Sequence, residues 1–365
     1  MNLFLRSAFV AAFLSMHSLP SLFCQEAGST KSRSRADLEA ATRLQVFLDR
    51  AEFAPGKIDG RYGEFTLKAL ALYSQAHGEE SGQSPDKGER ERDAVPDVSG
   101  LDLASIDPLF ISYTVTEADL QNIGEVPASI PEQAKLKSLP YKNAAEAIAE
   151  KFHADVDYLA ELNPGKIKSL KAGDQLSVPN VEPFEWAEVK DLKPGSEIAA
   201  KAANDLEDEP DAKSEKPDKE QKDKSGESAP PTAGVKIDTK TSMLTVYEGG
   251  KLIAAYPVTI GSEQTESPVG DWKVRGVAKM PNFRHDKAML KKGERSDDFH
   301  MLPPGPNNPV GVIWIALNKK GIGLHGTNDP DSIGRSASHG CVRLANWDVI
   351  RLAVKIKAGV PVAIH

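Results

Sequence analysis

Cysteine is nearly absent from this chain of 365 residues, which has only Cys24 and Cys341. Cys24 lies in an apolar N-terminal region. If that region is removed after export, no second cysteine is left for Cys341 and no internal disulfide can form. An unpaired thiol in an oxidising compartment is either a liability or a reactive group. The sequence around Cys341 indicates which of these two interpretations applies.

The sequence also lacks a long apolar run and an excess of basic residues. The apolar run at 8–14 is too short for a permanent membrane-spanning helix, and it lies between Arg6 and a break at Pro20. This order is typical of a secretory signal, which we place at 1–27; a buried N-terminal helix is the alternative. Lipidation at Cys24 stays open, although the bulky Phe23 argues against it. The net charge of -8 argues against a general affinity for nucleic acid or anionic lipid.

Residues 36–80 predict a small all-α unit. Leu44, Phe47 and Leu48 share one helical face, a turn-rich stretch "APGKIDGRYG" follows, and 65–73 carry a second apolar stripe. The segments "RLQVFL", "PGKIDGRYG" and "TLKAL" resemble the peptidoglycan-binding type 1 module. An unrelated helical packing domain is the alternative.

Residues 111–184 predict an α+β unit. The segment "NAAEAIAEKFHADVDYLAELNPG" indicates helix, turn and helix, and "LKAGDQLSVP" indicates a turn and a short strand. With the preceding "YTV", this order resembles LysM, a glycan-binding βααβ module. An extra stretch at 117–140 departs from that pattern, and the same apolar pattern would also serve a plain spacer.

Two segments are predicted as linkers, 81–110 and 198–232. Both are charged, contain Pro and Gly, and are poor in apolar residues. The second predicts a solvated tether that would let the C-terminal part reach distant substrates.

Residues 234–365 have a β-rich pattern. Short β-prone runs surround a turn at Glu248, Gly249 and Gly250, and "NWDVIRLAVKIKAG" predicts one helix with Asn346 as its N-cap. We therefore expect a mainly-β domain, sandwich or barrel-like, with one helix. The loop at 281–301, which contains His285 and His300, is expected to cover a groove or lie on the surface.

The chemistry of Cys341 requires a base, since a free thiol is only a few per cent ionised at neutral pH. His325 ends the apolar run "GIGLHG", so a strand would hold it rigidly; His339 lies two residues before the thiol. The carbonyl of Gly326 could orient the imidazole. Gly340 permits a tight turn whose N–H groups could stabilise an oxyanion, and Arg343 could pair with a substrate carboxylate.

These residues resemble the signature of the YkuD-type L,D-transpeptidases, in which "HGT" is followed by "SHGCVRL". The segments "YPVTIG", "SPVGDWKV" and "LPPGPNNPVG" extend the resemblance over most of 235–365. It implies that Cys341 is the acylated nucleophile, His325 its base and Gly326 the orienting carbonyl. The remaining motif positions would shape the oxyanion site and contact substrate: Ser338, His339, Gly340 and Arg343. Some family members have Asn where this chain has Arg343.

The resemblance also implies the reaction. The thiolate would attack the third residue of a tetrapeptide stem of peptidoglycan, release D-alanine and pass the acyl group to an amine of another stem or of an envelope protein. It implies a periplasmic or cell-envelope location and no metal or organic cofactor. Water as acceptor would give an L,D-carboxypeptidase. Two further alternatives stand, a non-catalytic wall-binding scaffold and a zinc site made by His325, His339 and Cys341, for which no fourth ligand is evident.

Overall fold

The computed structural model describes residues 34–78, 95–198, 233–261, 267–292, 295–319, 321–335 and 340–365. The predicted signal peptide with Cys24, residues 81–94 of the first linker and residues 199–232 of the second lie outside these ranges. Ser338 and His339 lie outside them as well. We refer to 34–78 as the helical region, to 95–198 as the βααβ region and to the described residues of 233–365 as the C-terminal domain.

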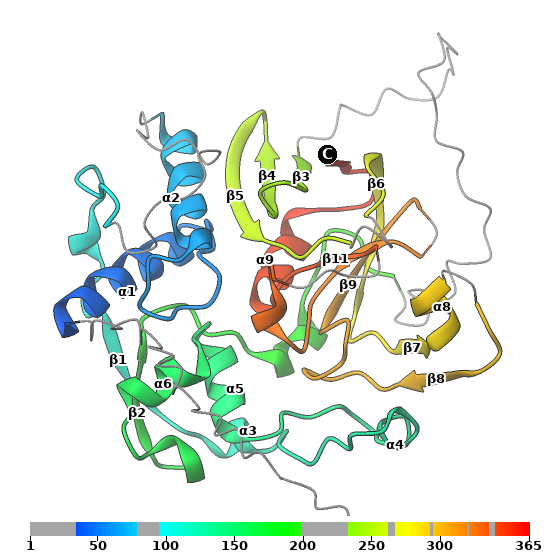
Figure 1. Cartoon of the computed structure of the whole chain (residues 1–365), viewed down its shortest axis with the longest axis horizontal. Helices are drawn as coiled ribbons and strands as arrows, with labels where there is room; N and C mark the ends of the chain where they lie inside the picture. Colours follow the sequence, from blue (N-terminus) through cyan, green and yellow to red (C-terminus); the bar gives the residue numbers. More distant parts are fainter. Residues whose placement is uncertain are drawn as a thin grey trace, which may run out of the picture. The chain divides into compact units, whose positions relative to one another are not determined.

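Eight strands of the C-terminal domain form one mixed sheet (Figure 1). Their order is β11-β10-β9-β6-β12-β3-β4-β5. The pairs β10–β11 and β12–β3 are parallel, and the other neighbours are antiparallel. In chain order, the strands are β3 (Ala233–Asp238), β4 (Met243–Glu248), β5 (Lys251–Pro257), β6 (Gly270–Lys279), β9 (Ile313–Leu317), β10 (Gly323–His325), β11 (Val342–Arg343) and β12 (Pro361–Ile364).

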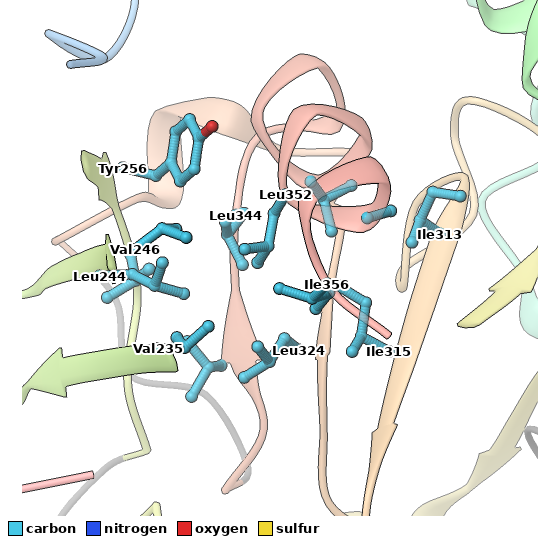
Figure 2. Packing of buried hydrophobic residues seen from close by; sticks show 14 of the residues in the cluster. Val235, Leu244, Val246, Tyr256, Ile313, Ile315, Leu324, Leu344, Leu352 and Ile356 are labelled. Atoms are coloured by element: carbon cyan, nitrogen blue, oxygen red, sulfur yellow. The ribbon is translucent and has the colours of Figure 1, made fainter. Parts of the chain in front are cut away.

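The apolar face of this sheet closes on one helix, α9 (Asn346–Lys355). Leu244 of β4 and Leu324 of β10 stand far apart in the strand order, yet both belong to the same core as Leu352 (Figure 2). Each is fully buried, which stabilises the fold by about 1.5–3 kcal/mol per side chain. The sheet is therefore curled around α9. The predicted mainly-β character of this domain is confirmed, with one curled sheet as its form.

The start of α9 differs from the prediction. Ala345 is the N-cap and makes no side-chain capping bond, whereas Asn346 is the first helical residue and is completely buried. Helical spacing places Trp347, Ile350 and Val354 on one expected apolar face, but Val354 is 48% exposed while Val349 and Leu352 are buried. Two overlapping apolar stripes run along this helix, and spacing alone does not tell which of them faces the sheet.

The stretch predicted as a covering loop contains regular structure. Strand β7 (Phe283–Asp286) pairs antiparallel with β8 (Phe299–Leu302) and sets His285 opposite His300. Between them lies α8 (Lys287–Lys292), a second helix in a domain for which one was expected. The buried Asp286 carboxylate accepts backbone N–H bonds from Ala288, Met289 and Ser296. These bonds hold the segment between β7 and β8 together.

The helical region consists of α1 (Arg35–Arg50) and α2 (Glu64–His77). In the βααβ region, β1 (Phe110–Thr114) pairs antiparallel with β2 (Gln175–Pro179), and α5 (Ala144–Lys151) and α6 (Val156–Leu162) lie between them in the chain. The extra stretch at 117–140 contains α3 (Glu117–Leu120) and α4 (Ile130–Gln133). Short 3-10 helices complete the elements: η1 (Leu103–Ser105), η2 (Ile167–Ser169), η3 (Trp186–Asp191) and η4 (Pro330–Ser332).

Part of the predicted 81–110 linker belongs to a folded core. Ile106 and Leu109 are 3% and 6% exposed and pack with Ile148 and Leu176 of the βααβ region. The charged residues of the predicted linker are concentrated at 86–93, whereas its 98–110 end also contains Val98, Leu101 and Leu103. The folded βααβ region therefore includes this end of the predicted linker.

The regions share their cores. Leu44 and Leu70 of the helical region pack with Met243 and Ala255 of the C-terminal sheet. Leu38 and Ile58, in turn, pack in the core of the βααβ region. Residues Arg35–His365 accordingly form one compact unit. The expectation that a tether lets the C-terminal domain search independently does not agree with these packed contacts.

Candidate active site

The predicted nucleophile and base come from neighbouring strands at one end of the sheet. Strand β11 pairs in parallel with β10, with Leu324 opposite Val342 and His325 opposite Arg343. Cys341 directly precedes β11. Because side chains alternate along a strand and paired residues face the same side, His325, Cys341 and Arg343 lie on one face. The fold thus brings together residues that are 16 positions apart in the sequence.

The imidazole of His325 is held from two sides. Its Nδ1 lies 2.6 Å from the carbonyl oxygen of Gly326, and its ring stacks on Trp314 with centroids 5.4 Å apart. Burial lowers the pKa of His325 to about 4; the nearby Arg343 lowers it further, while the bond to Gly326 opposes the shift. The ring is therefore neutral at neutral pH. With its Nδ1–H donated to Gly326, Nε2 carries the free lone pair that a base needs.

Cys341 is partly exposed, and its Sγ lies 3.5 Å from the carbonyl oxygen of Gly321. Close packing around the sulfur raises the pKa of the thiol to about 11, although a backbone hydrogen bond from Gly323 and the charge of Arg343 lower it in part. At rest the site contains a neutral thiol and a neutral imidazole. Proton transfer has to accompany bond formation in any reaction at this sulfur.

Arg343 brings a positive charge to the same face. Its backbone pairs with Thr259 in both directions at 2.9 Å, and its Nη1 donates to Ser332 Oγ at 3.2 Å. Its Nε is buried and has no hydrogen-bond partner among the described residues. This donor is suited to an anionic group, because a guanidinium binds a carboxylate through two parallel N–H bonds.

Of the remaining predicted positions, Gly340 has φ +103°, in the region that favours glycine, as the predicted tight turn requires. Ser338 and His339 lie outside the described residues. Within those residues, no group of three His, Cys, Asp or Glu side chains is arranged to hold a metal ion. The described helices also include none with the length and apolarity needed to cross a membrane.

Two contributors to the site were missed in the sequence. Trp314, which stacks on His325, lies in the β-prone segment "VIWIALN", where nothing distinguishes it from its apolar neighbours. Thr259 ties the segment before the cysteine in place, because its Oγ1 donates to the Ser332 carbonyl and accepts from the Gly334 N–H, both at 2.9 Å. An aromatic residue on a short strand and a threonine after "YPV" do not by themselves indicate a role in the site. Only the pairing of the strands shows that they lie next to His325 and to the segment before Cys341.

The helical region touches the segment that leads from His325 to Cys341. The Nζ of Lys57 pairs with both Asp331 and Asp155. The ring of Phe65 lies so close to Gly334, which has φ +70°, that a Cβ atom at Gly334 would collide with it. The turn-rich stretch "APGKIDGRYG" and the residues that follow it therefore contact the C-terminal domain.

A model of the YkuD family, described as the L,D-transpeptidase catalytic domain, matches residues 232–364. The putative L,D-transpeptidase YkuD of Bacillus licheniformis is 33% identical over 121 residues, 33% of this chain and 58% of the relative. YkuD of Bacillus subtilis is 31% identical over 131 residues, 36% of this chain and 63% of the relative. The putative L,D-transpeptidase YqjB of Bacillus subtilis is 31% identical over 133 residues, 35% of this chain and 68% of the relative. The chain thus spans about three-fifths of the first two relatives, and through its C-terminal domain it belongs to the YkuD-type L,D-transpeptidase family.

Proposed function

We propose that this protein is a peptidoglycan L,D-transpeptidase in which Cys341 is the nucleophile and His325 its general base. The observation that carries the proposal is the pairing of β10 with β11, which puts both side chains on one face while the Gly326 carbonyl fixes the imidazole. A rigidly placed base is what proton transfer requires. The YkuD-family match over the same residues supports the reaction class.

In the first half-reaction, the Cys341 sulfur attacks the carbonyl carbon of the third residue of a tetrapeptide stem, and its proton passes to Nε2 of His325. The tetrahedral intermediate collapses when the bond to the terminal D-alanine breaks. The imidazolium returns its proton to the leaving amine. A thioester and free D-alanine result, and His325 is neutral again, as its lowered pKa favours.

In the second half-reaction, an amine of another stem or of an envelope protein attacks the thioester carbon. His325 takes the amine proton, the new amide forms, and the departing sulfur is reprotonated. Water in place of the amine would release the tripeptide and make the enzyme an L,D-carboxypeptidase. The raised pKa of the thiol supports sulfur as a leaving group that is protonated on departure.

The other motif residues have supporting roles. The Nε of Arg343, which is buried and has no hydrogen-bond partner in the part of the chain that the structure describes, suits the carboxylate of the terminal D-alanine. The backbone at Gly340 would supply N–H groups to the oxyanion, each worth about 3 kcal/mol at comparable sites. By family resemblance, Ser338 and His339 complete that oxyanion site.

We also propose that the helical region is a peptidoglycan-binding type 1-like module and that the βααβ region is a LysM-like module. The pairing of β1 with β2 around α5 and α6 supports the second assignment. Both would hold the enzyme on the wall, in the periplasm or cell envelope. Because the two regions pack against the C-terminal domain, they would orient the active site on the wall rather than tether it loosely.

Mass spectrometry of the protein after incubation with a disaccharide-tetrapeptide tests the reaction. The wild type should gain a thioester adduct that lacks D-alanine and then yield a cross-linked dimer, whereas Cys341→Ala should give neither. His325→Gln should lose most of the activity, and His285→Gln is the matched control that should keep it. Tripeptide without dimer would indicate a carboxypeptidase. No adduct on a reduced Cys341 would refute the enzyme and favour the wall-binding scaffold.

A further inference from the structure

We propose that Glu150, which lies outside the C-terminal domain, is a positioning residue for His325 and acts through Asn346 and Gly326. The inference rests on the proposed role of His325 as the base. It adds a residue of the βααβ region to a site otherwise built from the C-terminal domain.

Glu150 lies near the end of α5 and is 9% exposed. Its Oε1 accepts a hydrogen bond from Asn346 Nδ2 at 2.9 Å, and its Oε2 accepts one from the hydroxyl of Tyr141. Both carboxyl oxygens therefore have donors. The bond to Asn346 crosses from the βααβ region to the first residue of α9.

Asn346 is completely buried and fills the space between two glycines of the C-terminal domain. A Cβ atom at either Gly326 or Gly311 would collide with Asn346 Oδ1. The same Oδ1 accepts the N–H of Val312 at 3.2 Å. The amide can accept from Val312 only while Nδ2 points away from it. Two acceptors hold Nδ2 in that orientation, Glu150 Oε1 at 2.9 Å and, more weakly, the Pro306 carbonyl oxygen at 3.4 Å.

Gly326 links this amide to the proposed base. Its backbone lies against Asn346, and its carbonyl oxygen accepts the Nδ1–H of His325. If the Asn346 amide turns or moves, the Gly326 peptide loses the surface that positions it. The hydrogen bond that selects the His325 tautomer then weakens, and misplacing a catalytic group by about 1 Å can cost on the order of a hundredfold in rate.

The surroundings of Glu150 support a role in geometry. Burial raises the pKa of Glu150 to about 7, and the nearby Glu146 raises it further, while the bonds from Tyr141 and Asn346 lower it. Keeping an acid in such a place opposes folding, and an apolar side chain of similar size would avoid that cost. The acid gives the Asn346 amide and the Tyr141 hydroxyl a shared acceptor.

The test compares Glu150→Met, Glu150→Gln and the control Glu146→Ala in the full chain. Methionine keeps the volume and removes the acceptor, while glutamine keeps an oxygen for Asn346. Glu146 lies on the same helix and accepts a hydrogen bond from Asn307 Nδ2 at 3.1 Å. Glu146→Ala therefore removes a contact between the βααβ region and the C-terminal domain that does not involve Asn346. The readouts are the ¹⁵N shifts of His325, which give its tautomer, and kcat and KM with tetrapeptide.

Glu150→Met should mix the His325 tautomers and lower kcat by about tenfold to a hundredfold with little change in KM. Glu150→Gln should restore most of both, and Glu146→Ala should leave both near wild type. Equal losses in Glu146→Ala and Glu150→Met, or an unchanged His325 tautomer in Glu150→Met, overturn the proposal. The tautomer readout needs no turnover, so it stands even if the proposed reaction fails.

If Glu150→Met does not fold, Asn346→Leu provides the test, because leucine keeps the volume of the side chain and removes the amide through which Glu150 would act. The His325 ¹⁵N shifts of Asn346→Leu should show mixed tautomers. Tyr141→Phe is the control and should leave these shifts near wild type, because it removes the donor to Glu150 Oε2 and keeps the bond between Oε1 and Asn346. Wild-type His325 shifts in Asn346→Leu refute the proposal.

Discussion

Asp49 of α1 and Arg351 of α9 form a two-pronged ion pair, with Oδ1–Nη1 at 3.1 Å and Oδ2–Nη2 at 2.9 Å. The Asp49 side chain is completely buried. The Nδ1 of His153, from the βααβ region, lies 3.1 and 3.2 Å from the two carboxylate oxygens. The His153 ring also stacks on Trp347 of α9 with centroids 5.2 Å apart. All three regions therefore meet at one carboxylate.

Removal of this carboxylate should destabilise the whole unit. Asp49→Ala leaves the Arg351 guanidinium without its main partner, and breaking a buried pair in this way typically costs about 3–5 kcal/mol. Urea unfolding measures the change. Glu39→Ala is the control, because its pair with Arg35 is exposed and such pairs contribute about 0–1 kcal/mol. Similar losses in the two variants would contradict a central role for Asp49.

Acid should weaken the same junction. Burial lowers the pKa of His153, with Arg351 adding to the effect and Asp49 opposing it. The unfolded chain therefore binds a proton more readily than the folded one. The contribution of neutral His153 is present above about pH 6.5 and is lost as the pH falls toward its folded pKa. The melting temperature of the wild type, followed from pH 7.5 to 5, should fall more steeply than that of His153→Gln; parallel curves would contradict this.

The thiol of Cys341 should react slowly at neutral pH. Since burial raises its pKa to about 11, the alkylation rate with iodoacetamide should increase about tenfold per pH unit from 7 toward 11. Mass spectrometry of the peptide that contains Cys341 separates its reaction from that of Cys24. In urea the profile should shift to the ordinary thiol pKa of about 8.5. A rate plateau near pH 6 would instead indicate a preformed thiolate–imidazolium pair.

A side chain at Gly334 should separate the helical region from the segment before Cys341. Gly334→Ala should lower the free energy of unfolding in two ways: the left-handed backbone costs about 1–2 kcal/mol for alanine, and the clash with Phe65 costs about 1–3 kcal/mol. Phe65→Ala removes the clash and leaves the backbone strain. The double variant should therefore be more stable than the sum of the two single changes predicts, by about 1 kcal/mol or more. Strict additivity would show that the contact carries no energy.

The sequence predicted the local parts of this structure well. The β-rich C-terminal domain with its helix near 346–355 follows from short-range patterns, and its family follows from "HGT" and "SHGCVRL". The sequence did not reveal which surfaces join the regions. Asp49 and Arg351 are 302 positions apart, and no local pattern marks either as a partner of the other. Asn346 was interpreted as a helix cap, because its partners Glu150 and Val312 become neighbours only in the folded chain.

The shared cores have a consequence for how the molecule unfolds. The helices of 34–78 cover Met243 and Ala255, so their detachment would expose the back of the C-terminal sheet to water. Each region therefore depends on its neighbours for part of its interior. Heating should melt residues 35–365 in one cooperative transition rather than in three steps. A destabilising substitution in a helix far from Cys341 would then lower the fraction of molecules that are folded, and with it the fraction that has an intact site around this cysteine.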